Sequence, residues 1–241
     1  APVWRVKIDG TDVTDSVLAN LTITSGRTNI YEQAQAGYCT LNLINLDLAA
    51  ITAEINDAVS IQVKDTAGAY VPIFGGSIVD VAVTVSQTGS VAITQEVTIT
   101  ALGALSRLQK ALTLGVLSKD FDGDQIYSIL EDLLVNNWSE VPAALTWANY
   151  TPATTTWATA ENTGLGEIDR PGNYELAHRG SSQTITWNLV ADLATSGLGY
   201  LYEDASGLIS YADSTHRSTY LATNGYTDLD ANQALGRGIK I

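Results

Sequence analysis

The feature that most limits how this chain can fold is a two-residue period of apolar side chains across residues 1–105. Short alternating runs are separated by turn clusters such as Asp9-Gly10. Successive side chains of a strand point to opposite faces, so the pattern predicts antiparallel strands with one buried face, as in a sandwich or barrel. The alternating residues are Trp4, Val6 and Ile8; Leu21 and Ile23; Cys39, Leu41 and Leu43; Val59, Ile61 and Val63; Val79, Val81, Val83 and Val85; and Val91, Ile93, Val97 and Ile99.

The period changes after Gly103. Residues 104–112 are apolar and fit either a short helix or a strand. Apolar residues then recur at helical spacing, which predicts an amphipathic helix that ends near Asn136. The residues on its apolar face are Ile126, Ile129, Leu130, Leu133 and Leu134.

A second helix is expected over residues 184–197, with Ser181-Ser182 as its start and Gly197 as its stop. A β-hairpin is expected directly after it, over residues 200–213. Between the two helices, residues 138 to about 180 are rich in Thr, Ala, Gly and Pro. That composition fits either a long loop with an ordered structure or a mobile loop.

The charge of the chain excludes some partners. A formal net charge of −14 over 241 residues disfavours nucleic-acid binding through phosphate neutralisation. No apolar run reaches the length of a membrane span, so no membrane insertion is expected. The chain begins with a strand-like pattern and without the basic and apolar regions of a signal peptide. Cys39, the one cysteine, lies on the apolar side of a strand and is interpreted as a buried thiol.

Acidic residues before the first predicted helix match part of a calcium-binding loop. Asp120, Asp122 and Asp124 alternate, and Glu131 follows at the twelfth place of an EF-hand template. The template needs glycine at the sixth place, where this chain has Gln125, and extended backbone where the helical period has already begun. We therefore expect no metal at these acids. Asp122 or Asp124 is predicted to cap the helix, and Glu131 to be solvated.

The other reactive residues form no recognisable catalytic motif. No nucleophile-elbow, zinc-protease, phosphate-loop or dinucleotide fingerprint occurs. His178 and His216 are far apart in the sequence and do not support a metal site. We expect no enzymatic activity and no cofactor. Four acids are interpreted as solvated surface groups and not as a glycosidase pair: Glu161, Glu167, Asp169 and Glu175.

Four aromatic residues are grouped between the predicted helices: Trp138, Trp147, Tyr150 and Trp157. They could form a platform for sugars, as in a carbohydrate-binding β module. They could also hold a long loop onto the domain or fill a subunit interface, where Trp and Tyr are enriched. Packing or an interface is the favoured interpretation.

Three segments resemble the hub proteins of tailed-bacteriophage tails, of the minor tail protein kind. The first, residues 4–47, has a strand, a G-x-D-V-T turn, a strand ending at Gly26-Arg27 and a further strand ending in N-x-D. The second pairs NDAVSIQV with PIFGGSIVDVAV, and the third is WNLVADLATSGLGYLYEDASGLISYADSTHR, a helix, a Gly, a strand, an acidic-Gly turn and an aromatic strand. Together the segments cover about two thirds of the chain, in the order of the family.

The resemblance implies a mostly β fold with some α, in which two antiparallel β-barrel-like domains are joined by a helical segment. The expected divisions are a first barrel-like domain over residues 1–105, a helical connector with the Thr- and Trp-rich loop over residues 106–180, and the helix and hairpin of a second barrel-like domain over residues 181–241.

The function implied by the resemblance is structural. Three copies would form a hub ring that adapts the six-fold tail tube or distal ring to the three-fold tip, bound to those neighbours and to tip or fibre proteins. DNA would pass through the lumen without specific binding. Such a protein is part of the virion and assembles in the cytoplasm of the host bacterium. The alternatives are the six-fold distal tail ring protein and an adhesin-like carbohydrate-binding module.

Overall fold

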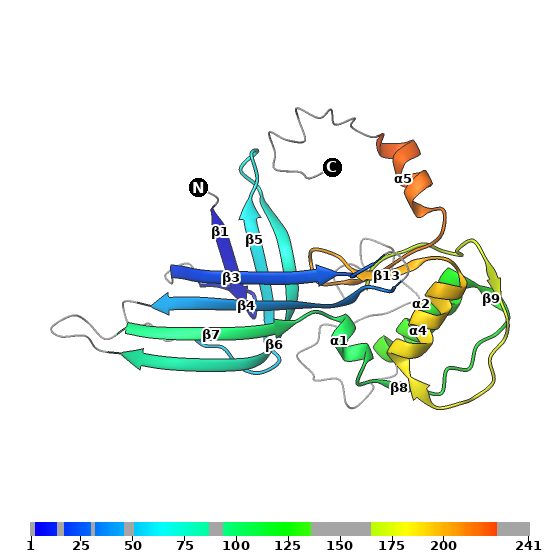
Figure 1. Cartoon of the computed structure of the whole chain (residues 1–241), viewed down its shortest axis with the longest axis horizontal. Helices are drawn as coiled ribbons and strands as arrows, with labels where there is room; N and C mark the ends of the chain where they lie inside the picture. Colours follow the sequence, from blue (N-terminus) through cyan, green and yellow to red (C-terminus); the bar gives the residue numbers. More distant parts are fainter. Residues whose placement is uncertain are drawn as a thin grey trace.

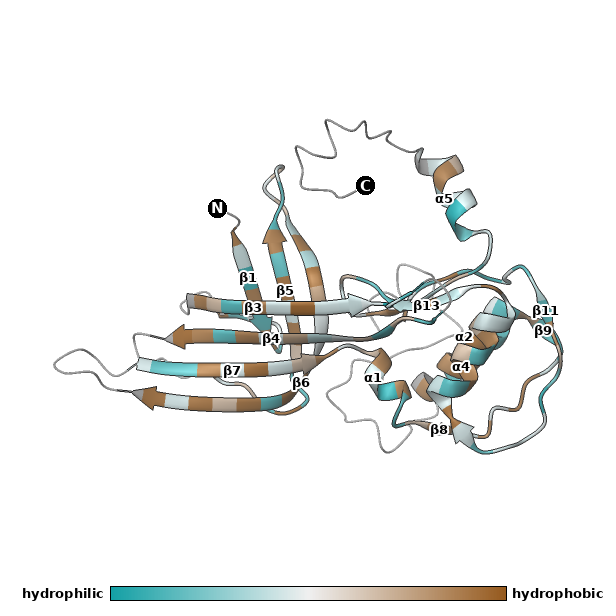
Figure 2. Ribbon diagram, in the orientation of Figure 1, coloured by the Kyte–Doolittle hydropathy of each residue, from teal (hydrophilic) through white to brown (hydrophobic). Residues whose placement is uncertain are grey.

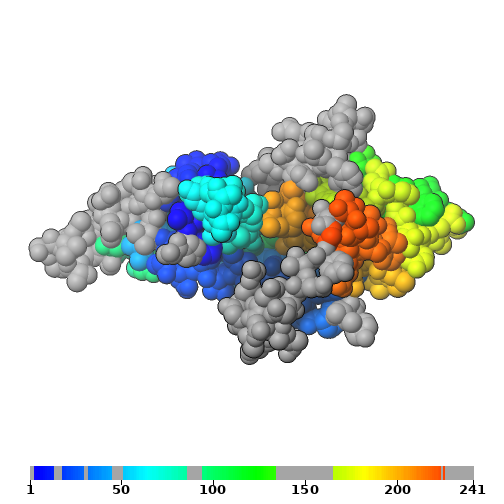
Figure 3. All heavy atoms as spheres, turned by 90° about the horizontal axis from the view of Figure 1, so that it is seen from above, coloured from blue at the N-terminus to red at the C-terminus, as the bar shows by residue number. Residues whose placement is uncertain are grey.

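The structure is a computed structural model that describes residues 3–13, 17–29, 32–45, 51–86, 94–135 and 165–225. Its described part is elongated, with a large sheet at one end and a helical part at the other (Figure 1). Figure 3 shows the same outline from above. The predicted class, mostly β with some α, is confirmed.

The larger sheet contains β1 (Trp4–Ile8), β2 (Thr11–Asp12), β3 (Val17–Gly26), β4 (Gln35–Asn45), β5 (Ala58–Lys64), β6 (Tyr70–Ser86) and β7 (Thr94–Leu102). The short elements that follow are α1 (Leu105–Leu108), β8 (Leu112–Thr113), β9 (Asp120–Phe121), β11 (Glu175–Leu176) and β12 (Thr184–Ile185). The remaining elements are α2 (Asp122–Val135), β10 (Leu165–Ile168), α4 (Thr186–Ser196), β13 (Tyr200–Glu203), β14 (Ile209–Ala212) and α5 (His216–Asn224).

The first seven strands form one antiparallel sheet in the order β2-β1-β5-β6-β7-β4-β3. The two-residue period of the sequence marks its buried face, since Cys39, Leu41 and Leu43 of β4 are at most 1% exposed. Figure 2 shows the alternation of apolar and polar residues along the strands.

The predicted buried thiol of Cys39 lies on this face of the sheet. Burial raises the pKa of the Cys39 thiol to about 12, so this thiol stays protonated at neutral pH.

At the ends of strands, the two-residue period of the sequence predicts more burial than the structure has. Trp4 begins β1 and is 41% exposed, while Val83 and Val85, near the end of β6, are 53% and 63% exposed. A strand end has fewer neighbours to cover it than a strand centre. The register of β6 also shifts between Ile78 and Asp80, so Val79 falls outside the run that the sequence analysis assigned to one face.

The predicted pair of barrels is not confirmed, and the part of the chain that the structure describes contains no closed barrel. Among the described residues β2 and β3 are the two edges of the sheet, and no pairing joins them. The sheet bends because β6 pairs with β5 through residues 70–77 and with β7 through residues 77–86. The second sheet is also not an antiparallel barrel, since it has the order β10-β14-β13 and its β10–β14 pair is parallel.

The second hydrophobic cluster lies in the helical part of the molecule. It contains apolar residues of α1, α2 and α4 together with those of β10, β13 and β14. The predicted helical face is confirmed for Ile126, Ile129, Leu130 and Leu133, which are all buried. Helix α4 ends at Ser196 with Gly197 as its C-cap, as predicted, but it starts at Thr186, later than Ser181-Ser182, because Thr184 and Ile185 pair with β8 instead.

Two separate clusters of buried residues therefore stabilise the molecule. The cluster of the sheet ends along the chain at Ala101, and the fully buried residues of the second cluster begin at Leu105. The three-part division of the chain expected from the sequence remains a prediction. No helix in the described ranges is long and apolar enough to cross a membrane.

Candidate functional site

The acids of the calcium-like spacing have different partners. Asp120 Oδ1 accepts a 2.8 Å hydrogen bond from the Phe121 N–H, and Asp124 Oδ1 pairs with Arg170 Nε at 2.7 Å. Glu131, predicted to be solvated, is half-buried, and this desolvation raises the pKa of its carboxyl group. The aromatic group Trp138, Trp147, Tyr150 and Trp157 lies outside the described residues.

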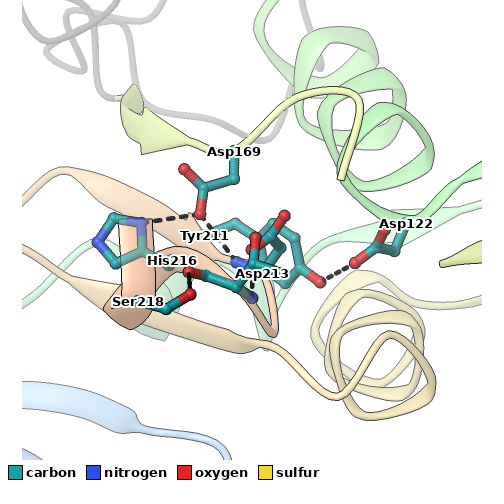
Figure 4. A network of polar contacts seen from close by, with 7 residues as sticks. Asp122, Asp169, Tyr211, Asp213, His216 and Ser218 are labelled. Carbon is teal, nitrogen blue, oxygen red and sulfur yellow. Dashed lines mark hydrogen bonds and ion pairs between the residues drawn. The ribbon is translucent and has the colours of Figure 1, made fainter. Parts of the chain in front are cut away.

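Asp122, one of the two residues predicted to cap α2, bonds to groups outside that helix. It is fully buried where α2 begins. Its Oδ2 accepts a 2.5 Å hydrogen bond from the Tyr211 hydroxyl (Figure 4). Its Oδ1 accepts a 3.0 Å bond from the Tyr174 N–H. Desolvation, followed by the hydrogen bond and the charge of Asp122, raises the pKa of Tyr211. Asp122 thus joins the start of α2 to β14 and to the segment before β11.

Two glycines make room for this buried carboxyl group. A Cβ atom on Gly172 would lie 2.2 Å from Asp122 Oδ1, and one on Gly197 would lie 2.4 Å from Oδ2. Gly172 also has a positive φ of 96°, a region that favours glycine. The glycine that was predicted to end α4 therefore also provides space for Asp122.

Glu203 connects the hairpin of the second cluster to the large sheet. Its Oε2 accepts a 2.7 Å hydrogen bond from the Gly37 N–H of β4, and its Oε1 accepts a 2.6 Å bond from the Leu105 N–H of α1. Desolvation raises the pKa of the Glu203 carboxyl group, and the two backbone hydrogen bonds oppose that shift. A Cβ on Gly103 would lie 2.1 Å from Oε2, so this glycine gives the carboxyl group its space.

Gln33 makes a second connection between the same two parts. Its Oε1 accepts a 2.8 Å hydrogen bond from the Leu201 N–H of β13. Its Nε2 donates to the Gly199 carbonyl and to Thr195 Oγ1, each at 3.2 Å. The segment before β4 is therefore hydrogen-bonded to both the end of α4 and the start of β13.

A close backbone contact completes this junction between the two clusters. The turn between β13 and β14 lies against β6, where a Cβ on Gly75 would come within 1.8 Å of the Ser206 carbonyl oxygen. Gly207 in that turn has a φ of +83°, and its own Cβ would lie 2.2 Å from the Gly75 carbonyl oxygen. Only glycine at both positions allows the two backbones to approach so closely.

Replacing Glu203 with glutamine is expected to lower the free energy of unfolding by about 1–3 kcal/mol. The amide keeps one acceptor oxygen but presents N–H groups where the second backbone donor needs an acceptor. Urea unfolding monitored by circular dichroism measures the change. Glu175→Gln is the matched control, because Glu175 makes an exposed 2.6 Å ion pair with Lys119. Equal stabilities of the two variants would contradict the role given to Glu203.

A pocket of about 350 Å³ lies between the end of β10 and α5. Glu167, Asp169 and His216 line it, together with Arg170 and Asp213. Asp169 Oδ2 is 2.8 Å from His216 Nδ1 and accepts a 3.0 Å hydrogen bond from the Asp213 N–H (Figure 4). The structure thus brings His216 together with Glu167 and Asp169, two acids that the sequence analysis interpreted as solvated surface groups.

The sequence contains only a weak signal for this grouping. Glu167 and Asp169 alternate at the end of a strand, but His216 follows 47 residues after Asp169. The link between them depends on the parallel pairing of β10 with β14, in which Ile168 lies opposite Tyr211. That pairing is long-range and leaves no local period.

No model of a known protein family matches the chain, and no curated protein sequence matches it. Among solved structures, it is similar to a 43 kDa tail protein of prophage MuSo2 from Shewanella oneidensis, with 12% identity and a TM-score of 0.48, over 87% of this chain and 54% of that one. It is similar to a tail protein of Neisseria meningitidis, with 9% identity and a TM-score of 0.49, over 88% and 50% of the two chains.

A third similar structure is a component of the type VI secretion system of E. coli, whose description notes similarity to the bacteriophage T4 tail proteins gp27 and gp5. It is 13% identical, with a TM-score of 0.46, over 86% of this chain and 48% of that one. The chain spans about half the length of each of these proteins. Identities and TM-scores this low do not by themselves establish a function. The structures to which the chain is similar are those of two tail proteins and of a component of the type VI secretion system.

Proposed function

We propose that the chain is a structural protein of a phage tail tip. Three copies form a hub ring that adapts the six-fold tail tube or distal ring to the three-fold tip and surrounds the DNA exit channel. Its partners are further copies of itself, the distal tail or tube protein and the tip or fibre proteins, and its place is the virion. Its role is mechanical and needs no catalytic residue.

The observation that carries the proposal is the order of elements in the three segments that resemble tail hub proteins. In the third segment, α4 is followed by Gly197, β13, an acidic turn and β14, which is the order that the resemblance implies. In the turn, Asp204 Oδ1 accepts hydrogen bonds from the Ser206 and Leu208 N–H groups, at 2.8 and 3.0 Å. In the first segment, the G-x-D-V-T turn begins at Gly10, between β1 and β2.

The charge and the surface of the chain support the same role. A net charge of −14 would reduce adhesion of DNA to the wall of a channel, since like charges repel. Four large apolar side chains are exposed around β8 and β12: Leu112, Leu114, Val116 and Ile185. Exposed apolar groups close together are typical of association surfaces.

Native mass spectrometry of the purified chain tests the ring directly. We expect a species with three times the 25.6 kDa mass of the chain, and three copies per ring in images of purified tails. Six copies per ring would instead assign the chain to the distal tail ring. A monomer at all concentrations that never enters tails would refute the proposal.

A further inference from the structure

The pocket at α5 carries an inference that is independent of the tail role. Ligand atoms of Glu167, Asp169 and His216 all lie within 4.8 Å of one another. The ligands of one Zn²⁺ ion lie roughly 3 Å apart, because Zn–N and Zn–O bonds are about 2.0–2.2 Å long. The 2.8 Å separation of Asp169 Oδ2 and His216 Nδ1 is close to that spacing. Glu167 is exposed, so a change of its side-chain rotamer can bring its carboxylate to the same ion.

Two of these three groups are held in place by the surrounding fold. The Asp169 N–H donates to the Tyr211 carbonyl at 3.0 Å, and the Asp169 carboxylate accepts from the Asp213 N–H. His216 is the first residue of α5, and the preceding turn is fixed by Asp213, whose Oδ1 accepts a 2.7 Å bond from the Thr215 N–H. Ligands fixed in this way lose little side-chain entropy when an ion binds.

The charges around the pocket also suit a cation. Arg170 is the basic residue of the lining other than His216, and its guanidinium is engaged elsewhere. Its Nε pairs with Asp124, and its guanidinium carbon lies 3.8 Å from the centre of the Tyr127 ring. The Asp213 carboxylate is also engaged, since it accepts the hydrogen bond of the Thr215 N–H in the turn before α5. The other acidic and imidazole groups of the lining are the carboxylates of Glu167 and Asp169 and the imidazole of His216, and an ion would replace the present hydrogen bond between Asp169 and His216.

We propose that Glu167, Asp169 and His216 bind one divalent transition-metal ion of the Zn²⁺ type. A set of two oxygens and one imidazole nitrogen favours such an ion, since Ca²⁺ and Mg²⁺ prefer oxygen ligands alone. The volume of about 350 Å³ leaves room for water molecules to complete the coordination shell.

The ion would connect α5 to the rest of the molecule. His216 is half-buried, whereas residues 217–223 of α5 are exposed, so few side chains of the helix pack against other elements. A shared ion would join the end of β10 to the first residue of α5, which is 47 residues further along the chain than Asp169. The role of the proposed ion is therefore structural: it would hold the start of α5 against the end of β10.

Isothermal titration of the chain with ZnCl₂ tests the site, with CoCl₂ as a coloured substitute. We expect one ion per chain, and visible Co²⁺ bands that differ from those of the aqueous ion. His216→Gln and Glu167→Gln should each weaken Zn²⁺ binding by at least about tenfold. Mg²⁺ and Ca²⁺ should bind much more weakly than Zn²⁺.

Two matched variants separate this site from general binding to an acidic surface. His178→Gln replaces the other histidine, which is exposed, and Glu175→Gln replaces an exposed acid outside the pocket. Both should bind Zn²⁺ like the unchanged chain, and Zn²⁺ should raise the unfolding temperature in these variants but not in His216→Gln. Circular dichroism checks that each variant is folded. Absence of Zn²⁺ binding, or equal binding by His216→Gln and His178→Gln, would refute the proposal.

Discussion

Replacing Asp122 with alanine is expected to lower the free energy of unfolding by about 3–5 kcal/mol, the largest effect of any single carboxyl group described for this chain. The carboxyl group is fully buried and accepts hydrogen bonds from the Tyr211 hydroxyl and the Tyr174 N–H. Its removal leaves the buried Tyr211 hydroxyl and the partly buried Tyr174 N–H without this acceptor, and it leaves a void beside Gly172 and Gly197. Urea unfolding of the purified variant measures the change.

The neighbouring acid is the control for this prediction. Asp124 lies in the same first turn of α2 and makes a partly exposed ion pair with Arg170. Because such pairs are screened by solvent, Asp124→Ala should cost at most about 1 kcal/mol. Asp122→Asn should fall between the two alanine variants, since it keeps one acceptor oxygen. If Asp122→Ala and Asp124→Ala were equally stable, Asp122 would not be the centre of this network.

Replacing Gly75 with alanine is expected to cost about 2–4 kcal/mol and to loosen the contact between the β13–β14 turn and the large sheet. The new Cβ would lie 1.8 Å from the Ser206 carbonyl oxygen, and backbone atoms cannot rotate away as a flexible side chain can. The turn must therefore shift, which also disturbs the nearby hydrogen bonds of Glu203. Chemical denaturation gives the loss of stability, and hydrogen exchange at Leu208 reports the loosening of the turn.

Gly180→Ala is the matched control for Gly75→Ala. A Cβ at Gly180 meets no atom within 4 Å, and its φ is not positive, so the substitution adds a methyl group without a clash or backbone strain. It should change stability by less than about 1 kcal/mol. Similar losses for both variants would mean that the close approach of Gly75 to Ser206 contributes little to the junction.

Local patterns in the sequence predicted most of the elements of this fold. The alternation of Cys39, Leu41 and Leu43 predicted a strand with one buried face, and β4 has it. The helical spacing from Ile126 to Leu133 predicted α2, and Gly197 marked the end of α4. Such features depend on residues a few positions apart, so the sequence alone is sufficient to place them.

Closure of the sheets could not be predicted in the same way. The period marks which face of a strand is buried, but it does not specify which strands lie at the edges. The offset of β6, which pairs with β5 through one half and with β7 through the other, produces the bend of the sheet. The parallel pairing of β10 with β14 has no local signal either, and the second antiparallel barrel that the sequence predicted is not confirmed.

The acidic residues show most clearly which features are local and which depend on long-range contacts. The sequence spacing of these acids matched part of a calcium-binding loop and predicted a helix cap. The burial of Asp122, in contrast, depends on its contact with Tyr211, which lies 89 residues away. Glu203 has partners 166 and 98 residues away, and His216 meets Asp169 across 47 residues. The sequence by itself determined the type of the long strands of the large sheet and of helices α2 and α4, because period and turn chemistry are local. Only the tertiary structure decided which acids are buried, paired or grouped, because that depends on contacts between distant parts of the chain.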